Sequence, residues 1–359
     1  MAYELLDNTY LFSDALTIVL KDFEVPLGDS AMYRLNLGEL GLSTRNQFVY
    51  ANNIQLTPKY GRYEFGAIKG EVVDRWEVSQ RRLEIQDLNL RLLLSQQAIR
   101  AREIRLKDPR LEIFKDKRYP FPFKRPKMPW EELRNMSTYL HLDSVTVLNG
   151  YVFYEEHNEG ADTTSWFKLD ELDATIKPIS NDSFLLMQDP ELYLNSSAIV
   201  MDEALLNFRA SIPYTDTSNY HTIEGDVFEL PAHALNPIIE KPANIRAMSG
   251  NILEVHFRFR ADNQISRGKM RMRYNDLKVN LLNPKPQKKR GLGRLVGSGL
   301  ANTFVLHTDN PKRNRFMRVG RIEFEREHNK GFLVYWIKSI VEGIKSSVGI
   351  SKKEEKELE

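Results

Sequence analysis

A short pattern of apolar and polar positions recurs nine times along the chain. Each copy contains an apolar residue, two mostly polar positions, and then two apolar residues separated by one position. Residues two apart in a strand project from the same face, so each copy predicts a strand with one apolar face. The whole series predicts a repetitive β-sheet. The clearest copies begin at Leu20, Ile85, Leu169 and Tyr274, and looser copies begin at Leu37, Ala51, Ala101, Leu142 and Val319.

In two copies the alternation changes parity. Ile18 and Leu20 are followed by Phe23 and Val25, and the same change occurs between 270 and 281. In a regular strand the second pair would point to the opposite face, whereas one inserted residue, a β-bulge, returns it to the first face and bends the strand. We favour bulges, which predict a wide sheet that curls. The alternative is that one apolar residue of each copy belongs to a second core on the other face.

Two further patterns predict a hairpin and a pair of strands. Asn149-Gly150 is a favoured type I′ turn, so residues 142–154 are expected to form a hairpin. Strict alternation over 253–259 predicts a half-buried strand whose partner is 269–281.

Helical spacing predicts an amphipathic helix over 331–346 near the end of the chain. We expect its apolar stripe on one side and Lys338, Glu342 and Lys345 on the other. The stripe consists of Leu333, Trp336, Ile337, Ile340, Val341 and Ile344. Shorter helices are expected at 91–100, 130–136 and 231–240.

Composition allows one large β domain or two to three average ones, because 42% of the 359 residues are apolar. The formal net charge of +2 conceals an asymmetry, since residues 281–350 contain fourteen Lys and Arg against five Asp and Glu. This basic end is expected to face a partner. The chain contains no cysteine, which excludes disulfides and thiolate metal sites and mildly favours an oxidising compartment such as the periplasm.

The first residues do not resemble an export signal. Residues 1–7 lack a basic region and an apolar region, and no stretch approaches the roughly 18 apolar residues of a spanning helix. The sequence as given is therefore expected neither to export itself nor to span a bilayer. A role in a cell envelope would require a leading segment.

Residues with catalytic or metal-binding chemistry do not form a recognisable site. The seven histidines show neither pairing at i and i+4 around a glutamate nor clusters with carboxylates. Glu155-Glu156 and Asp170-Glu171 are strand neighbours that would point to opposite faces. The glycines over 291–299 lack the ending of a phosphate-binding loop, and Ser298 lacks the spacing of a nucleophile elbow. We expect no enzyme, metal, cofactor or small-molecule substrate.

Residues 115–130 are rich in proline, basic and aromatic side chains. The prolines prevent a regular ladder. Cations beside aromatic rings can bind single-stranded nucleic acid, but these rings more simply cover the edge of a sheet. We rank a structural cap first, anionic lipid headgroups second and nucleic acid third, and expect no nucleic-acid partner.

The helix over 331–346 also has two interpretations. Its apolar stripe could cover the sheet, which base rates slightly favour. Alternatively, the helix could lie in a membrane interface beside anionic lipids. The expected interface residues are then Trp336, Ile337, Ile340, Lys338 and Lys345.

Several short motifs follow one another in an order that is more specific than any one of them. They are Leu148-Asn149-Gly150-Tyr151-Val152, Leu172-Asp173-Ala174-Thr175-Ile176, Leu235-Asn236-Pro237-Ile238-Ile239, Ser249-Gly250-Asn251-Ile252-Leu253, Tyr274-Asn275-Asp276-Leu277-Lys278-Val279, the passage from Leu300 to Pro311, Arg318-Val319-Gly320 and Tyr335-Trp336-Ile337-Lys338-Ser339. In this order they resemble the AsmA-like family of Gram-negative envelope proteins, particularly its Bacteroidetes-type members. The resemblance covers roughly residues 80–350.

The resemblance implies a fold and a function. It implies a long antiparallel sheet curled into an open, apolar-lined trough, related to TamB and to bridge-like lipid carriers. Such proteins help to move phospholipid between the inner and outer membranes or maintain the outer membrane. Family members usually begin with an inner-membrane helix, which this sequence does not contain.

The expected architecture is therefore mainly β, with a long curved antiparallel sheet forming an open apolar groove, a few short helices and a C-terminal amphipathic helix. Residues 1–283 are expected to form the groove, 284–327 a basic connector and terminal strands of the same sheet, and 328–359 the helix and a charged tail.

The expected function is non-enzymatic binding or conduction of phospholipid in the periplasm, in association with a membrane and with other envelope proteins as further partners. The alternative is a structural or assembly factor for outer-membrane biogenesis that carries no lipid. Lys288, Lys289 and Arg290 are expected to contact anionic headgroups. Acyl chains are expected to lie against Leu253, Val255, Phe257, Phe259, Met270, Met272, Leu277 and Val279, where methionines and aromatics suit chains of varied shape.

Overall fold

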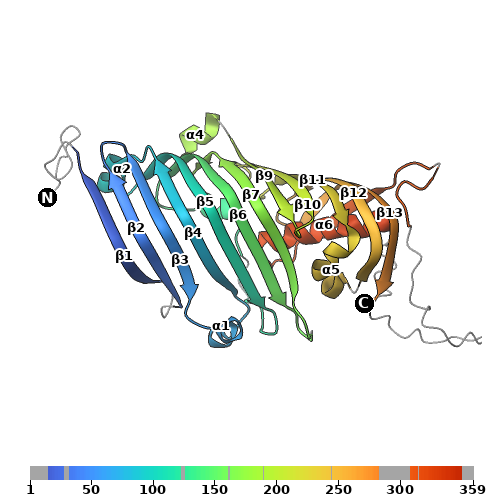
Figure 1. Cartoon of the computed structure of the whole chain (residues 1–359). Helices are drawn as coiled ribbons and strands as arrows, with labels where there is room; N and C mark the ends of the chain where they lie inside the picture. The colour runs from blue at the N-terminus through green and yellow to red at the C-terminus, as the bar shows by residue number, and fades with distance from the viewer. Residues whose placement is uncertain are drawn as a thin grey trace, which may run out of the picture.

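One long, open, curved sheet makes up most of the molecule, as expected from the sequence (Figure 1). The computed structural model describes residues 15–27, 32–122, 126–160, 162–188, 190–243, 245–282, 308–313 and 315–349. The sheet has 14 strands, and 57% of the chain is strand and 18% helical. The prediction of a mainly β protein with an open groove and a C-terminal helix is confirmed.

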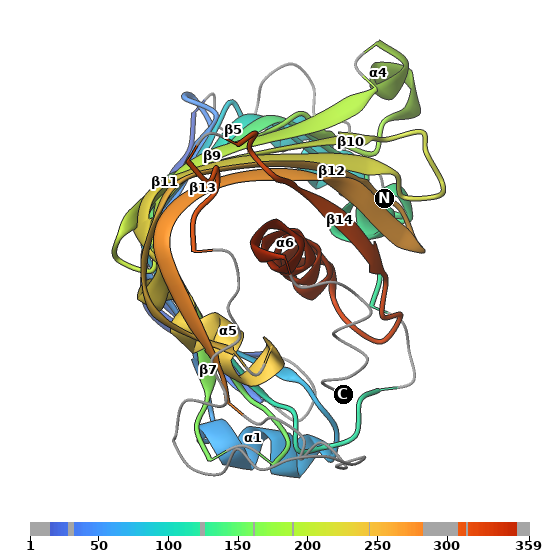
Figure 2. The ribbon, with the colours of Figure 1, turned by 90° about the vertical axis from the view of Figure 1, so that its right-hand side faces the viewer.

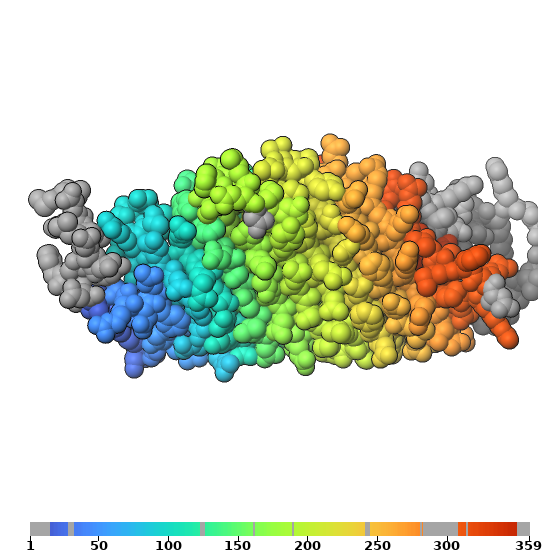
Figure 3. All heavy atoms as spheres, turned by 90° about the horizontal axis from the view of Figure 1, so that it is seen from above, coloured from blue at the N-terminus to red at the C-terminus, as the bar shows by residue number. Residues whose placement is uncertain are grey.

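The strands follow one another in chain order across the sheet, except that β8 lies off this path and pairs with β6. Figure 3 shows the same order along the length of the molecule. The strands are β1 (Thr17–Leu27), β2 (Tyr33–Ser43), β3 (Phe48–Pro58), β4 (Asp74–Gln86), β5 (Ile99–Asp116), β6 (Leu140–His157), β7 (Ser165–Lys177), β8 (Ile179–Ser180), β9 (Glu191–Val200), β10 (Ala204–Pro213), β11 (His221–Pro231), β12 (Ile245–Ala261), β13 (Ile265–Leu281) and β14 (Val319–Glu325). The helices are α1 (Arg62–Lys69), α2 (Leu90–Gln96), α3 (Pro129–Arg134), α4 (Ser183–Gln188), the 3₁₀ helix η2 (Ala232–Leu235), α5 (Asn236–Ala243) and α6 (Phe332–Val348).

The sheet is mixed, which corrects the expectation of a purely antiparallel one. β5 and β6 pair in parallel, with Ile99 opposite Leu140 and Asp116 opposite His157. A parallel pair requires the chain to return to the end where the first strand began. Residues 117–139 make this return.

The expected hairpin over 142–154 is wrong. β6 runs without a turn from Leu140 to His157, and Asn149 lies within it at a positive φ of 55°. The Asn-Gly pair therefore lies at an irregular position inside a strand. Asn suits this position because it tolerates the left-handed conformation that most residues avoid.

Such irregularities line up across the sheet. The pairing of β1 with β2 omits Asp22 and Gly38, and the pairing of β4 with β5 omits Arg81 and Asp108, without any slip in register. Beyond each unpaired residue the apolar residues move from even to odd positions or the reverse. They therefore stay on the same face of the sheet. This transverse row consists of Asp22, Gly38, Asn53, Arg81, Asp108 and Asn149.

The bulge interpretation holds for one of the two copies with a parity change. β12 and β13 shift register near Ser249 and Glu254, beside Asp276 at a φ of 51°. In β1, by contrast, a left-handed Asp22 changes the parity and both strands omit one position, so no residue is inserted. Register shifts also occur between β6 and β7 and between β7 and β9.

Two apolar rows cross all thirteen strands of the path on the inner face of the curve. The first inner row contains Ile18, Leu42, Val49, Ile85, Ile104, Val145, Ile176, Leu194, Ala210, Ile223, Phe259, Gly268 and Ile322. The second inner row contains Leu20, Leu40, Ala51, Leu83, Leu106, Val147, Ala174, Ser196, Phe208, Gly225, Phe257, Met270 and Gly320.

The opposite face carries mostly polar residues at the positions between these rows. The outer row contains Val19, Gly41, Tyr50, Glu84, Arg105, Thr146, Thr175, Asn195, Arg209, Glu224, Arg258, Lys269 and Arg321. One face of the sheet is therefore apolar along its whole length and the other is suited to water.

Candidate binding groove

α6 fills the C-terminal half of the groove. Figure 2 shows the helix inside the curve of the sheet, and its side chains join one buried cluster with those of β10–β14. Residues of the inner rows here are almost fully buried, with exposed fractions of 2% for Phe257 and 0% for Met270. This half of the apolar face is covered by the protein itself.

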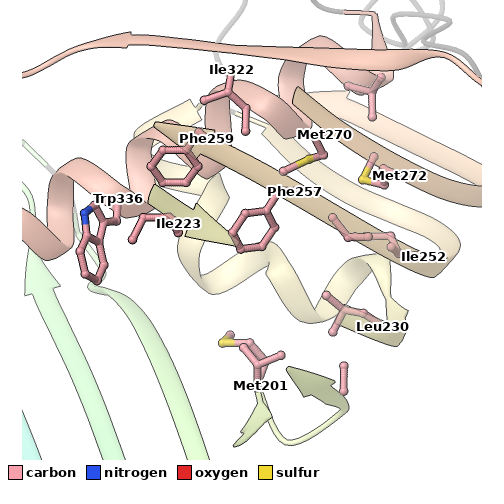
Figure 4. Close-up of a cluster of buried hydrophobic side chains, with 14 of the residues drawn as sticks. Met201, Ile223, Leu230, Ile252, Phe257, Phe259, Met270, Met272, Ile322 and Trp336 are labelled. Atoms are coloured by element: carbon pink, nitrogen blue, oxygen red, sulfur yellow. The ribbon is translucent and has the colours of Figure 1, made fainter. Parts of the chain in front are cut away.

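The residues expected to line a lipid site lie mainly in this filled half. Seven of the eight are buried, and Figure 4 shows several of them together with Ile322 and Trp336. The eighth, Leu253, is 37% exposed because the strand is irregular between Ile252 and Glu254. In this conformation the seven pack against the chain's own side chains and leave no surface for an acyl chain. They are Val255, Phe257, Phe259, Met270, Met272, Leu277 and Val279.

Small residues allow α6 to approach the sheet closely. A Cβ atom on Gly320 would lie 2.6 Å from the carbonyl oxygen of Gly343 and 2.3 Å from the Oγ of Ser347. Buried hydroxyls complete the contact, since the Oγ atoms of Ser266 and Ser339 are 2.7 Å apart. The helix face toward the sheet thus has a small residue on every turn, at Ser339, Gly343 and Ser347.

The first half of α6 is held by aromatic side chains. Trp336 is 7% exposed and stacks on Trp130 of α3, with ring centroids 6.3 Å apart at 17°. Its Nε1–H donates a hydrogen bond to Nε2 of His221 over 2.9 Å. Trp130 comes from the aromatic-basic segment, so its side chain acts there as part of the core.

These contacts correct the interpretation of α6 as a membrane-interface helix. Trp336 is buried and Ile340 packs against the same cluster, so neither is free to enter lipid. Lys338 pairs with Glu327, and Lys345 lies 3.2 Å from Glu342. Ile337 is half-buried, and Leu333, expected in the apolar stripe, is exposed. The helix covers the sheet, which is the interpretation that base rates slightly favoured.

His221 is held in its neutral form at this contact. Nδ1 lies 2.7 Å from the carbonyl oxygen of Asn219, which can only accept, so Nδ1 carries the proton and Nε2 accepts from Trp336. Burial lowers the pKa of His221 from 6.5 to about 4.

Stability is therefore expected to fall as the pH drops from 7 to 4. In this window the unfolded chain protonates His221 and the folded protein does not, so the free energy of unfolding decreases, by about 3 kcal/mol at most from this group. Urea unfolding at several pH values measures the effect. The His221→Gln variant, which can still accept from Trp336, should show a weaker dependence than the native chain. An identical pH dependence in both would contradict the assignment.

The N-terminal half of the groove is more open. The inner-row residues of β1–β7 and β9 are mostly half-buried, and at the β1 edge Ile18, Leu20 and Val25 are exposed, Leu20 by 50%. A third apolar row extends this surface beyond the transverse row. It contains Val25, Leu35, Leu56, Val78, Leu111, Val152, Leu169, Val200 and Ala204.

The described parts of the segment between β5 and β6 are held at two distant places on the sheet. We call residues 117–122 and 126–128 the strap. At one end the amide of Val72, beside α1, donates to the carbonyl oxygen of Pro120 over 2.8 Å. At the other end Arg326, beyond β14, donates to the carbonyl oxygen of Pro126, and Met128 is fully buried in the cluster beneath α6.

Three further sequence predictions concern headgroup residues, membrane-spanning helices and metal sites. Lys288, Lys289 and Arg290 lie outside the described residues. Within the described ranges, no helix is long and apolar enough to cross a bilayer, and no group of three or more His, Asp or Glu side chains is placed to hold a metal ion.

Comparison with protein-family models and with curated proteins found no match for the chain. The groove must therefore be interpreted from its own residues.

Sequence reasoning missed the residues of the open half. Copies of the pattern begin at Leu20, Leu37 and Ala51, and they predict an apolar face on the first strands. The clearest alternation, over 253–259, instead marks the part that α6 covers. Strict alternation identifies an apolar face and does not say what packs on it.

Proposed function

We propose that the chain is a non-enzymatic, AsmA-like protein of the cell envelope that binds phospholipid, with acyl chains against the inner rows of β1–β7 and β9. The observation that supports this is the contrast between the two halves of one continuous apolar face, buried under α6 in one half and partly exposed in the other. A contiguous apolar surface that stays partly exposed is characteristic of a site for an apolar ligand.

The dimensions and energetics suit an acyl chain. Eight neighbouring strands about 4.8 Å apart span about 34 Å, which exceeds the roughly 15 Å depth of one bilayer leaflet. Each methylene moved from water onto an apolar surface gains about 0.8 kcal/mol, so a chain of many methylenes would bind without any specific polar contact. The polar outer row would face water while the inner rows hold lipid.

The proposed setting is the periplasm, in association with a membrane, with phospholipid as the ligand and no cofactor. The experiment is extraction of purified protein with organic solvent followed by mass spectrometry. We expect phospholipid in the extract, and loss of the signal after delipidation should be reversed by incubation with vesicles. Protein that carries no phospholipid and takes up none from vesicles would contradict the proposal.

The filled half of the groove favours a second candidate, a structural or assembly factor without lipid carriage. There the apolar face has its own cover, as a scaffold requires. A protein with this role would still fold and bind envelope partners but would exclude lipid from both halves. The same extraction experiment separates the two, because the scaffold predicts an empty extract.

A further inference from the structure

Two lysines lie beyond the third apolar row, Lys115 near the end of β5 and Lys117 just after it. Asp74, Lys115 and Glu156 are opposite one another on β4, β5 and β6. Lys115 Nζ lies 2.9 Å from Asp74, and Lys117 Nζ lies 2.5 Å from Glu156. Both lysine side chains are largely buried, so their charges act in surroundings that screen them less than water does.

Two further lysines approach from α6 and the turn before it. Lys338, in the second turn of α6, pairs with Glu327. Lys330, directly before the helix, places Nζ over the ring of Phe121 in the strap, 2.9 Å from its centroid. The four lysines come from segments about 200 residues apart in sequence, and Lys117 itself belongs to the strap.

The four lysines act on one another. Burial first, and then the charges of Lys117, Lys338 and Lys115, lower the pKa of Lys330 to about 8 against the opposing effect of Glu327. Burial likewise lowers the pKa of Lys117, with Lys115 and Lys338 adding to the effect. Like charges crowded in this way are stabilised by an anion.

The carboxylates present do not balance the cluster. Asp74, Glu156 and Glu327 each pair with one lysine, which leaves Lys330 with a ring contact and no carboxylate at ion-pair distance among the described residues. Four positive charges thus face three negative ones. One additional negative charge would balance the four lysine charges.

The cluster lies where the filled half of the groove meets the open half. α6 ends against β13 and β14, where Ser347 and Gly343 pack, and begins beyond Trp336 on the side of β10 and β11. Its first turn therefore points toward the open half, whose strands β4–β6 carry Lys115 and its partners. The third apolar row crosses β4, β5 and β6 four residues from Asp74, Lys115 and Glu156.

We propose that the cluster of Lys115, Lys117, Lys330 and Lys338 binds the headgroup of a phospholipid with net negative charge, with the acyl chains extending along the third apolar row toward β1. This rests on the proposed function and adds to it a charge preference and an orientation. The phosphate of such a headgroup would supply the missing negative charge near Lys330, and lysine is a common ligand of phosphate. In a zwitterionic headgroup the ammonium group cancels this charge.

The test compares two water-soluble short-chain lipids with identical acyl chains, phosphatidylglycerol and phosphatidylcholine, on the full chain by calorimetry. A charged hydrogen bond predicts roughly tenfold or more tighter binding of phosphatidylglycerol. Lys330→Met should remove this preference and leave phosphatidylcholine binding unchanged, and Lys330→Arg should restore it. Lys269→Met, on the exposed outer row, is the matched control and should change nothing.

Each other outcome is decisive. Equal affinity for the two lipids, or an unchanged preference in Lys330→Met, would overturn the headgroup site and leave the proposed function in place. Inorganic phosphate that competes as well as phosphatidylglycerol would assign the cluster to free phosphate. Binding of neither lipid would instead contradict the proposed function itself.

Discussion

Replacing Val147 with aspartate is expected to abolish phospholipid binding. Val147 lies in the second inner row on β6, half-buried in the open half of the groove. An acyl chain on that row would have to strip water from the new carboxylate, which costs several kcal/mol without a compensating partner. We expect the affinity to fall by at least about a hundredfold, measured by displacement of a fluorescent fatty-acyl probe.

The neighbouring residue provides the control. Leu148 follows Val147 directly, lies opposite Lys107 on the other face and is 38% exposed. Leu148→Asp introduces the same negative charge on the same strand, but on the opposite face. This variant should bind the probe as tightly as the native chain does. Thermal unfolding of both variants shows whether they remain folded. Native affinity in a folded Val147→Asp variant would place the acyl chains elsewhere.

The apolar face itself could be predicted from the sequence. The copies beginning at Leu20, Leu37 and Ala51 occupy the sheet as expected, and their apolar positions share one face. The prediction succeeds because the period of two is a local property of a strand. The change of parity was also visible locally, although at Asp22 a left-handed residue produces it in place of an inserted one.

Strand direction could not be predicted, because one local signal fits two structures. Asn149-Gly150 suits a type I′ turn, yet Asn149 adopts a positive φ inside a continuous strand. The parallel pairing of β5 with β6 depends on the route of residues 117–139 across the molecule. No periodicity within either strand records that route.

The cover over the filled half was predicted only in part. The apolar stripe of α6 gave the helix but left open whether it faces protein or membrane. A second signal could have resolved this, since Ser339, Gly343 and Ser347 recur every four residues and small residues permit close packing. The lysine cluster offers no comparable signal, because Lys117 and Lys330 meet only through the fold.

The close packing of α6 predicts a marked difference between two glycine-to-alanine variants. Gly320→Ala places a methyl group 2.6 Å from the backbone oxygen of Gly343, which cannot move without lifting the helix, so we expect a loss of about 2–3 kcal/mol in the free energy of unfolding. Gly343→Ala meets only side-chain atoms, Cε of Met270 and Cγ1 of Ile322, both at 2.9 Å, and the end of the methionine can move aside. Alanine also favours a helix over glycine by about 1 kcal/mol, so this variant should lose less stability than Gly320→Ala.

Urea unfolding of both variants measures the difference, and limited proteolysis shows whether α6 is released. Lifting the helix from β13 and β14 would expose Met270 and Ile322, which are both fully buried in the native chain. Gly320→Ala should therefore also bind an apolar dye more strongly than Gly343→Ala. Equal stability of the two variants would mean that α6 tolerates displacement from the sheet, and the filled half of the groove would then be open to ligands as well.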